Sequence, residues 1–147
     1  MRGENLRGVD DRMKTMYKTE VTSHGGREGT VRSSDGHLEL QVGMPGAGGD
    51  ATNPEQLFAA GYAACYHSAL KSIAQSKKID TEGSEVIAHV SLHKGDDGYM
   101  LSAILEVKIP GLDEPQIMEL AEAAHQMCPY SKATRGNIAV DLKATTV

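Results

Sequence analysis

The sequence predicts an α+β fold in which the strands are mostly antiparallel. Short segments of alternating apolar and polar residues, separated by glycine-rich turns, indicate strands at 17–22, 30–33, 37–42, 86–93, 99–109 and 138–146. Two longer segments, 53–77 and 113–127, have the apolar spacing of helices. The order of strands, helix, hairpin, helix and strand is typical of α+β proteins.

The first predicted helix has a clear start and an unusual surface. Asn53 suits the N-cap, Pro54 suits the first helical position, and Gln56 completes a pattern close to a capping box. Its small and apolar face consists of Leu57, Ala60, Ala64, Ser68 and Leu70. We expect the small residues at 59–61 and 63–64 to pack closely on both sides, in part against a second copy of the chain.

Length and composition favour one cytoplasmic domain. The 147 residues fit a single domain, predicted at 13–147, with 1–12 as a disordered lead-in. The net charge is -5 and no basic run is present, which argues against a nucleic-acid partner. No apolar stretch approaches the ~18 residues of a membrane span, and the first residues lack the apolar centre of a secretion signal. In the cytoplasm thiols are usually kept reduced.

The only two cysteines, Cys65 and Cys128, are the main candidates for chemistry. They could form a structural bridge, a metal pair or a redox pair, and their surroundings favour the redox pair. Pro129 should end the second helix at Cys128. A cysteine attacks as its thiolate, which needs nearby positive charge. The candidate cation is Arg27, and its candidate partner is Glu55, because an Arg–carboxylate pair is rigid and directional.

Geometry restricts how this pair could reach Cys65. Glu55 and Cys65 are ten residues apart, which is roughly 15 Å along a continuous helix. Either the helix breaks between them, or Arg27 and Glu55 act on Cys65 of a partner subunit. The small-residue face favours the second reading, so we expect a homodimer with active sites at the subunit interface.

Other readings of these residues stay open. Cys65, His67, His125 and Cys128 could in principle form a tetrahedral zinc site. Cys65 and His67 would point apart on a helix, which disfavours that site. A thiol redox sensor without turnover could use the same residues as an enzyme. Taken alone, each of Cys65, Arg27 and Glu55 also has a plain structural explanation.

Three segments together closely resemble one family. The segments 25–29, 52–65 and 125–137 are similar to the organic hydroperoxide resistance proteins (Ohr) of the OsmC/Ohr superfamily. The resemblance runs from about residue 15 to the C-terminus, and the segment after Cys128 favours the Ohr branch over the OsmC branch. It implies an OsmC/Ohr-like intertwined homodimer with two sheets around central helices. Tyr66 departs from the phenylalanine commoner at that position.

The resemblance also implies a reaction. Cys65 would be the peroxidatic cysteine and Cys128 the resolving cysteine, with Arg27 and Glu55 activating Cys65. Organic hydroperoxides would be reduced to alcohols through a Cys65 sulfenic acid and a Cys65–Cys128 disulfide. A dithiol such as dihydrolipoamide, usually on a lipoylated protein, would then reduce the disulfide.

Apolar side chains would set the substrate preference. Leu57, Phe58 and Met44 would favour alkyl and fatty-acid hydroperoxides over hydrogen peroxide. No bound cofactor or metal is implied. The alternatives are an OsmC-like peroxidase of broader specificity and a redox sensor that does not turn over.

Overall fold

The computed structural model describes residues 8–9 and 12–147, so nearly all of the predicted lead-in at 1–12 lies outside the described residues. The chain divides into two compact units, one ending at Thr52 and one spanning Asn53–Val147. Each unit is described by itself. A single domain over 13–147 stays a prediction.

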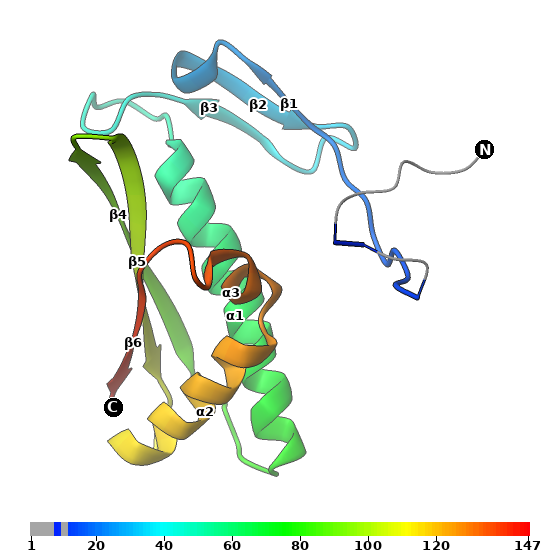
Figure 1. Ribbon diagram of the computed structural model, residues 1–147, viewed down its shortest axis with the longest axis vertical. Coiled ribbons are helices and arrows are strands. Elements are labelled where there is room, and N and C mark those ends of the chain that lie inside the picture. The colour runs from blue at the N-terminus through cyan, green and yellow to red at the C-terminus, as the bar shows by residue number, and fades with distance from the viewer. Residues whose placement is uncertain (1–7, 10–11) are drawn as a thin grey trace. The chain divides into compact units, whose positions relative to one another are not determined.

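The first unit contains a three-stranded antiparallel sheet in the order β1-β2-β3 (Figure 1). Its strands are β1 (Val21–His24), β2 (Gly29–Ser33) and β3 (Glu39–Val42). The strand predicted at 17–22 was misplaced, because β1 begins only at Val21. The turn after His24 sets the register, pairing His24 with Thr30 and Val21 with Ser33, the last residue of β2.

A single 3₁₀ turn, η1 (Gly26–Glu28), joins β1 to β2 and carries Arg27. The turn depends on glycine at its two ends. Gly25 has φ +85°, in the left-handed region that other residues rarely adopt. A Cβ on Gly29 would lie 1.7 Å from the His24 carbonyl oxygen. The glycine-rich sequence therefore fixes the backbone that presents Arg27.

The second unit is a three-stranded sheet with helices on one face (Figure 1). Its strands are β4 (Glu85–Gly95), β5 (Gly98–Lys108) and β6 (Val140–Thr145), in the order β4-β5-β6. β4 and β5 form the predicted antiparallel hairpin, whereas β6 lies parallel to β5. Its helices are α1 (Pro54–Ser76), α2 (Glu114–Met127) and α3 (Pro129–Thr134).

The core lies between this sheet and the helices. Leu105, Val107 and Ile109 alternate along and just beyond β5 and are fully buried, as expected for side chains on one face of a strand. They meet apolar residues of α1 and α2 in one cluster. Its helical members include Tyr62, Tyr66, Leu70, Ala74, Ile117, Leu120, Ala121 and Ala124.

The helix boundaries follow the capping signals. The Asn53 side chain accepts a hydrogen bond from the Gln56 backbone N–H at 2.8 Å, so the predicted N-cap is confirmed. α2 ends at Met127, and Cys128 has extended backbone, as the following proline requires. The segment after Cys128 forms the short helix α3, because proline is also a good first residue of a helix.

Of the predicted small and apolar face of α1, Leu70 is fully buried, whereas Ala60, Ala64 and Ser68 are exposed in this single chain. Close packing of the small residues against a second copy stays a prediction. Tyr62 and Tyr66, one turn apart, are fully buried in the core. Tyrosine can take such positions when its hydroxyl finds a partner. The Tyr66 hydroxyl donates to the Ala121 carbonyl oxygen at 2.6 Å.

Across the described residues, no helix has both the length and the apolar character needed to cross a bilayer.

The outer face of the second sheet carries one nearly buried carboxylate, Glu106, which is 8% exposed. It accepts hydrogen bonds from the Thr145 hydroxyl at 2.7 Å and from His89 Nε2 at 2.9 Å. The Lys143 ammonium lies 4.0 Å away. These bonds, the one from Thr145 foremost, lower the pKa of Glu106 from 4.5 to about 2.

Glu106→Gln should make the free energy of unfolding depend less steeply on pH in the acid range. A carboxyl whose pKa is lowered by folding stabilises the protein above its unfolded pKa, and that contribution is lost as pH falls from 4.5 towards about 2. Urea unfolding at several pH values would measure the slope. Glu119→Gln is the control, because the Glu119 side chain is 74% exposed and forms a surface ion pair with Lys77. Equal slopes in the wild type and Glu106→Gln would contradict the assignment.

Candidate functional site

The two cysteines are neighbours in the second unit and differ in exposure. Cys65 lies in α1, is half-buried and packs against the core cluster. Cys128 is fully buried at the junction of α2 and α3. Both are free thiols, and Cys128 acts on the titration of Cys65 through its charge and a hydrogen bond. The structure therefore brings the two predicted redox residues together.

The surroundings within this unit do not activate Cys65. Burial is the main cause that raises the pKa of its thiol, and the interactions with Cys128 act in the same direction. A hydrogen bond from the backbone N–H of Tyr130 opposes them. Because only the thiolate attacks a peroxide, Cys65 needs further positive charge or hydrogen bonding. The activating role of Arg27, which lies in the first unit, stays a prediction.

The course of α1 decides between two explanations for Glu55. Pro54–Ser76 forms one unbroken helix, so Glu55 and Cys65 lie on the same continuous helix. Ten residues separate them by roughly 15 Å of helical rise. A break in the helix is therefore not the route by which Glu55 approaches Cys65. Action on the cysteine of a second subunit is the explanation that is left, and it stays a prediction.

Two of the three predicted substrate-contacting residues lie on the cysteine helix. Leu57 and Phe58 are in the first turns of α1 and are half-buried. The Phe58 ring stands at 88° to the Tyr62 ring, with their centroids 5.8 Å apart. Met44 is 50% exposed in the loop of the first unit that follows β3. The structure does not place Met44 relative to the other two.

A buried hydrogen-bond cluster holds α3 onto α1 beside the cysteines. The Tyr62 hydroxyl lies 2.9 Å from Ser131 Oγ and 3.1 Å from Thr134 Oγ1. His125 Nδ1 lies 2.7 Å from Ser131 Oγ. This cluster is not among the predictions from the sequence. Its one signal in the sequence is Tyr62, because a tyrosine among alanines in a core helix requires a polar partner.

The two histidines of the alternative zinc site have hydrogen-bond partners of their own. His67 Nε2 lies 2.8 Å from Ser84 Oγ, and His125 is bound to Ser131. Burial, followed by a nearby cation, lowers the pKa of each imidazole. In the part of the chain that the structure describes, no three His, Cys, Asp or Glu residues form a group that could hold a metal ion.

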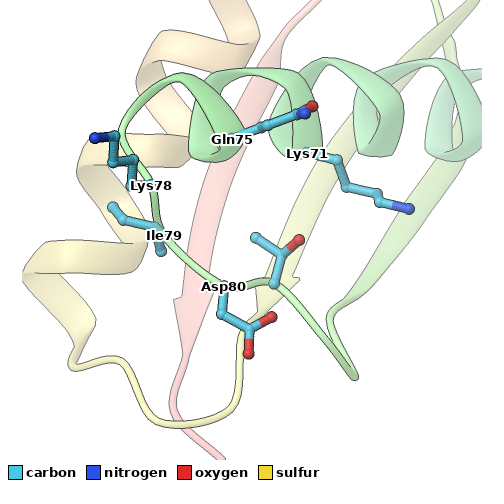
Figure 2. A pocket seen from close by; sticks show the side chains of 6 residues that line it. Lys71, Gln75, Lys78, Ile79 and Asp80 are labelled. Atoms are coloured by element: carbon cyan, nitrogen blue, oxygen red, sulfur yellow. The ribbon is translucent and has the colours of Figure 1, made fainter.

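A surface hollow of about 450 Å³ lies at the C-terminal end of α1 (Figure 2). Lys71 and Gln75 project from the helix, and Ile79 and Asp80 come from the segment that follows it. Neither cysteine lines this hollow, so the hollow is separate from the cysteine pair. Its lysines and its carboxylate are surface groups.

Comparison with known proteins decides the family. A family model described as OsmC-like protein matches residues 46–143. The chain belongs to the OsmC-like family. It is 50% identical over 135 residues to the organic hydroperoxide resistance protein OhrA of Bacillus subtilis, covering 87% of this chain and 95% of the relative. The organic hydroperoxide resistance protein of Xanthomonas axonopodis pv. citri is 45% identical over 134 residues, or 88% and 94% of the two chains.

Solved structures of the family share the fold. The crystal structure of OhrB of Bacillus subtilis matches with a TM-score of 0.84 and 44% identity, over 89% of this chain and 100% of that chain. The predicted α+β, OsmC/Ohr-like fold and the resemblance to the Ohr proteins are thereby confirmed.

One glycine of α1 makes room for the segment that follows Cys128. A Cβ on Gly61 would lie 2.7 Å from the Tyr130 hydroxyl oxygen and 3.2 Å from two carbons of its ring. Gly61 precedes Cys65 by four residues, so both lie on the same face of the helix. The Tyr130 ring also packs on Tyr62, with centroids 5.7 Å apart. The absent side chain thus lets Tyr130 lie against the cysteine face of α1.

Gly61→Ala should destabilise the protein, although alanine normally stabilises a helix by about 1 kcal/mol relative to glycine. The added methyl would displace Tyr130, and overpacking typically costs about 1–3 kcal/mol. Thermal and urea unfolding would measure the loss. Adding Tyr130→Phe removes the nearest atom and should recover part of it. A Gly61→Ala protein as stable as the wild type would show that Tyr130 does not need this gap.

Proposed function

We propose that this chain is a cysteine-based peroxidase that reduces organic hydroperoxides to alcohols. The observation that carries the proposal is the half-buried thiol of Cys65 beside the fully buried thiol of Cys128. The names of the relatives support it, since they are organic hydroperoxide resistance proteins. A peroxide can reach the more exposed sulfur, while the buried one is kept for the second step.

The proposed reaction has three steps. The Cys65 thiolate attacks the distal oxygen of ROOH, the O–O bond breaks, and the alkoxide takes a proton and leaves as the alcohol. Cys65 is then a sulfenic acid. The Cys128 thiol condenses with it, forming the S–S bond and releasing water. A dithiol, proposed as dihydrolipoamide on a lipoylated protein, supplies two electrons and two protons that restore both thiols.

Activation of Cys65 is the part of the proposal that needs a second subunit. Burial raises the pKa of the Cys65 thiol, so a cation is required to favour the thiolate. We assign that role to Arg27, paired with Glu55, acting across the interface of a homodimer. The unbroken helix from Pro54 to Ser76 supports action between subunits, because it keeps Glu55 away from its own Cys65.

The proposed substrates are alkyl and fatty-acid hydroperoxides. Leu57, Phe58 and Met44 would provide apolar contacts, and two of them are half-buried on the cysteine helix. The proposed setting is the cytoplasm, where dithiol reductants are available. An OsmC-like peroxidase of broader specificity is the alternative within the family, and a sensor that is oxidised once is the alternative outside enzymes.

Steady-state assays with dihydrolipoamide as the sole reductant should show fast consumption of cumene hydroperoxide and much slower consumption of hydrogen peroxide. The apolar contacts should favour the organic substrate. Similar rates with both peroxides would favour the OsmC-like alternative. Consumption of a single equivalent would favour the sensor, or a different reductant.

The two cysteine variants should fail in different ways. Cys65→Ser should abolish peroxide consumption, because serine cannot supply the attacking thiolate. Cys128→Ser should consume one equivalent and leave Cys65 open to over-oxidation, because no second thiol captures the sulfenic acid. Mass spectrometry of the protein after peroxide treatment distinguishes the two. Multiple turnovers by Cys65→Ser would sink the mechanism.

A further inference from the structure

The buried cluster between α1, α2 and α3 has a definite direction of proton donation. The Thr134 hydroxyl donates to the Ser131 carbonyl oxygen at 3.1 Å, so its only proton is used there. Tyr62 must therefore donate to Thr134 Oγ1. Ser131 must then donate to the Tyr62 oxygen. Any other assignment with one proton per contact leaves two oxygens facing each other without a proton.

The same count fixes the role of His125. Since the Ser131 proton is directed to Tyr62, the 2.7 Å contact between His125 and Ser131 requires a proton on His125 Nδ1. The chain of donors is then His125, Ser131, Tyr62 and Thr134. In the described residues no buried side-chain oxygen or nitrogen is left without a partner, in keeping with a complete chain.

This chain of hydrogen bonds holds in place the segment that lies beside Cys65. Ser131 and Thr134 are the two buried residues of α3, and both are bound to Tyr62 of α1. Tyr130 lies between Ser131 and the junction at Cys128, and its ring rests on Gly61. Its backbone N–H is the hydrogen-bond donor that acts on the Cys65 sulfur. A shift of α3 would move this N–H and Cys128 together.

We propose that Tyr62, Ser131 and His125 are positioning residues, whose hydrogen-bond chain holds the Tyr130 N–H against the Cys65 sulfur. The inference rests on the proposed function, since it concerns the thiol that would react with the peroxide. The three side chains of this hydrogen-bond chain contact neither the substrate nor the reductant. It acts through α3, by keeping one donor aimed at the sulfur where negative charge develops.

Tyr62→Phe tests the proposal most directly. Phenylalanine keeps the ring that packs on Phe58 and Tyr130 but removes the hydroxyl. The readout is the rate of iodoacetamide alkylation of Cys65 in the reduced full-length chain as a function of pH, followed by peptide mass spectrometry. The midpoint of this pH–rate curve should move to higher pH in Tyr62→Phe than in the wild type. At neutral pH alkylation should slow by roughly three- to tenfold, as expected from weakening one hydrogen bond to a charged sulfur.

Tyr66→Phe is the matched control. Tyr66 is equally buried one turn further along α1, and its hydroxyl donates to the Ala121 carbonyl oxygen of α2 rather than to α3. Its loss should lower stability by a similar amount without moving the midpoint of Cys65 alkylation. An equal shift in both variants would mean that general loosening is the cause, and it would overturn the proposal.

Three further variants keep the test decisive if Tyr62→Phe does not fold. Ser131→Ala removes the central link and should shift the midpoint in the same direction. His125→Asn can still donate from its amide nitrogen, so it should lie closer to the wild type than His125→Ala does. Wild-type midpoints in folded Ser131→Ala and His125→Ala would overturn the proposal.

Alkylation requires neither peroxide nor dithiol. Absence of peroxidase turnover in the wild-type protein would therefore refute the proposed function, and the alkylation test of the positioning role would still be interpretable. A wild-type midpoint in an active Tyr62→Phe protein would refute only the positioning role.

Discussion

The buried hydroxyl of Tyr62 is the interaction on which the geometry of the cysteine pair depends. It links α1 to Ser131, 69 residues further along the chain, inside the core. An unpaired hydroxyl at that depth would cost about 1–3 kcal/mol, so the fold must bring α3 to it. Cys128 directly precedes α3 and Cys65 follows Tyr62 by less than one turn. The hydrogen bonds of this one hydroxyl therefore link the helix that carries Cys65 to the segment that directly follows Cys128.

Burial disfavours the thiolate form of Cys65, and the groups of the second unit do not compensate for this effect alone. The thiol of Cys65 is half-buried, and this burial is the main cause that raises its pKa, which disfavours the thiolate. The one opposing contribution is a backbone N–H from Tyr130. A peroxidatic role consequently needs a cation from outside the groups that surround Cys65 in Asn53–Val147. This need is the physical reason for assigning Arg27 to the reaction.

The parts of the fold that local rules govern were predictable from the sequence. Asn53 and Pro54 gave the start of α1, and Pro129 gave the end of α2, because capping and proline geometry act over a few residues. The parallel pairing of β6 and the buried face of α1 depend on tertiary contacts. The two buried tyrosines decide that face, and their partners lie in α2 and α3. No spacing pattern within α1 reveals partners so distant.

The unequal burial of the two sulfurs orders the proposed chemistry. Cys128 is fully buried, so a peroxide meets Cys65 first. The second step needs the Cys128 sulfur to move to bonding distance, about 2.05 Å. Cys128 lies at a break between two helices, held by one backbone hydrogen bond to Ala124 and one from Lys132. A local adjustment there disrupts fewer hydrogen bonds than one inside α1, where Cys65 is held on both sides by helical turns. In the proposed reaction the resolving thiol thus lies at the junction of two helices, and the attacking thiol lies within one helix.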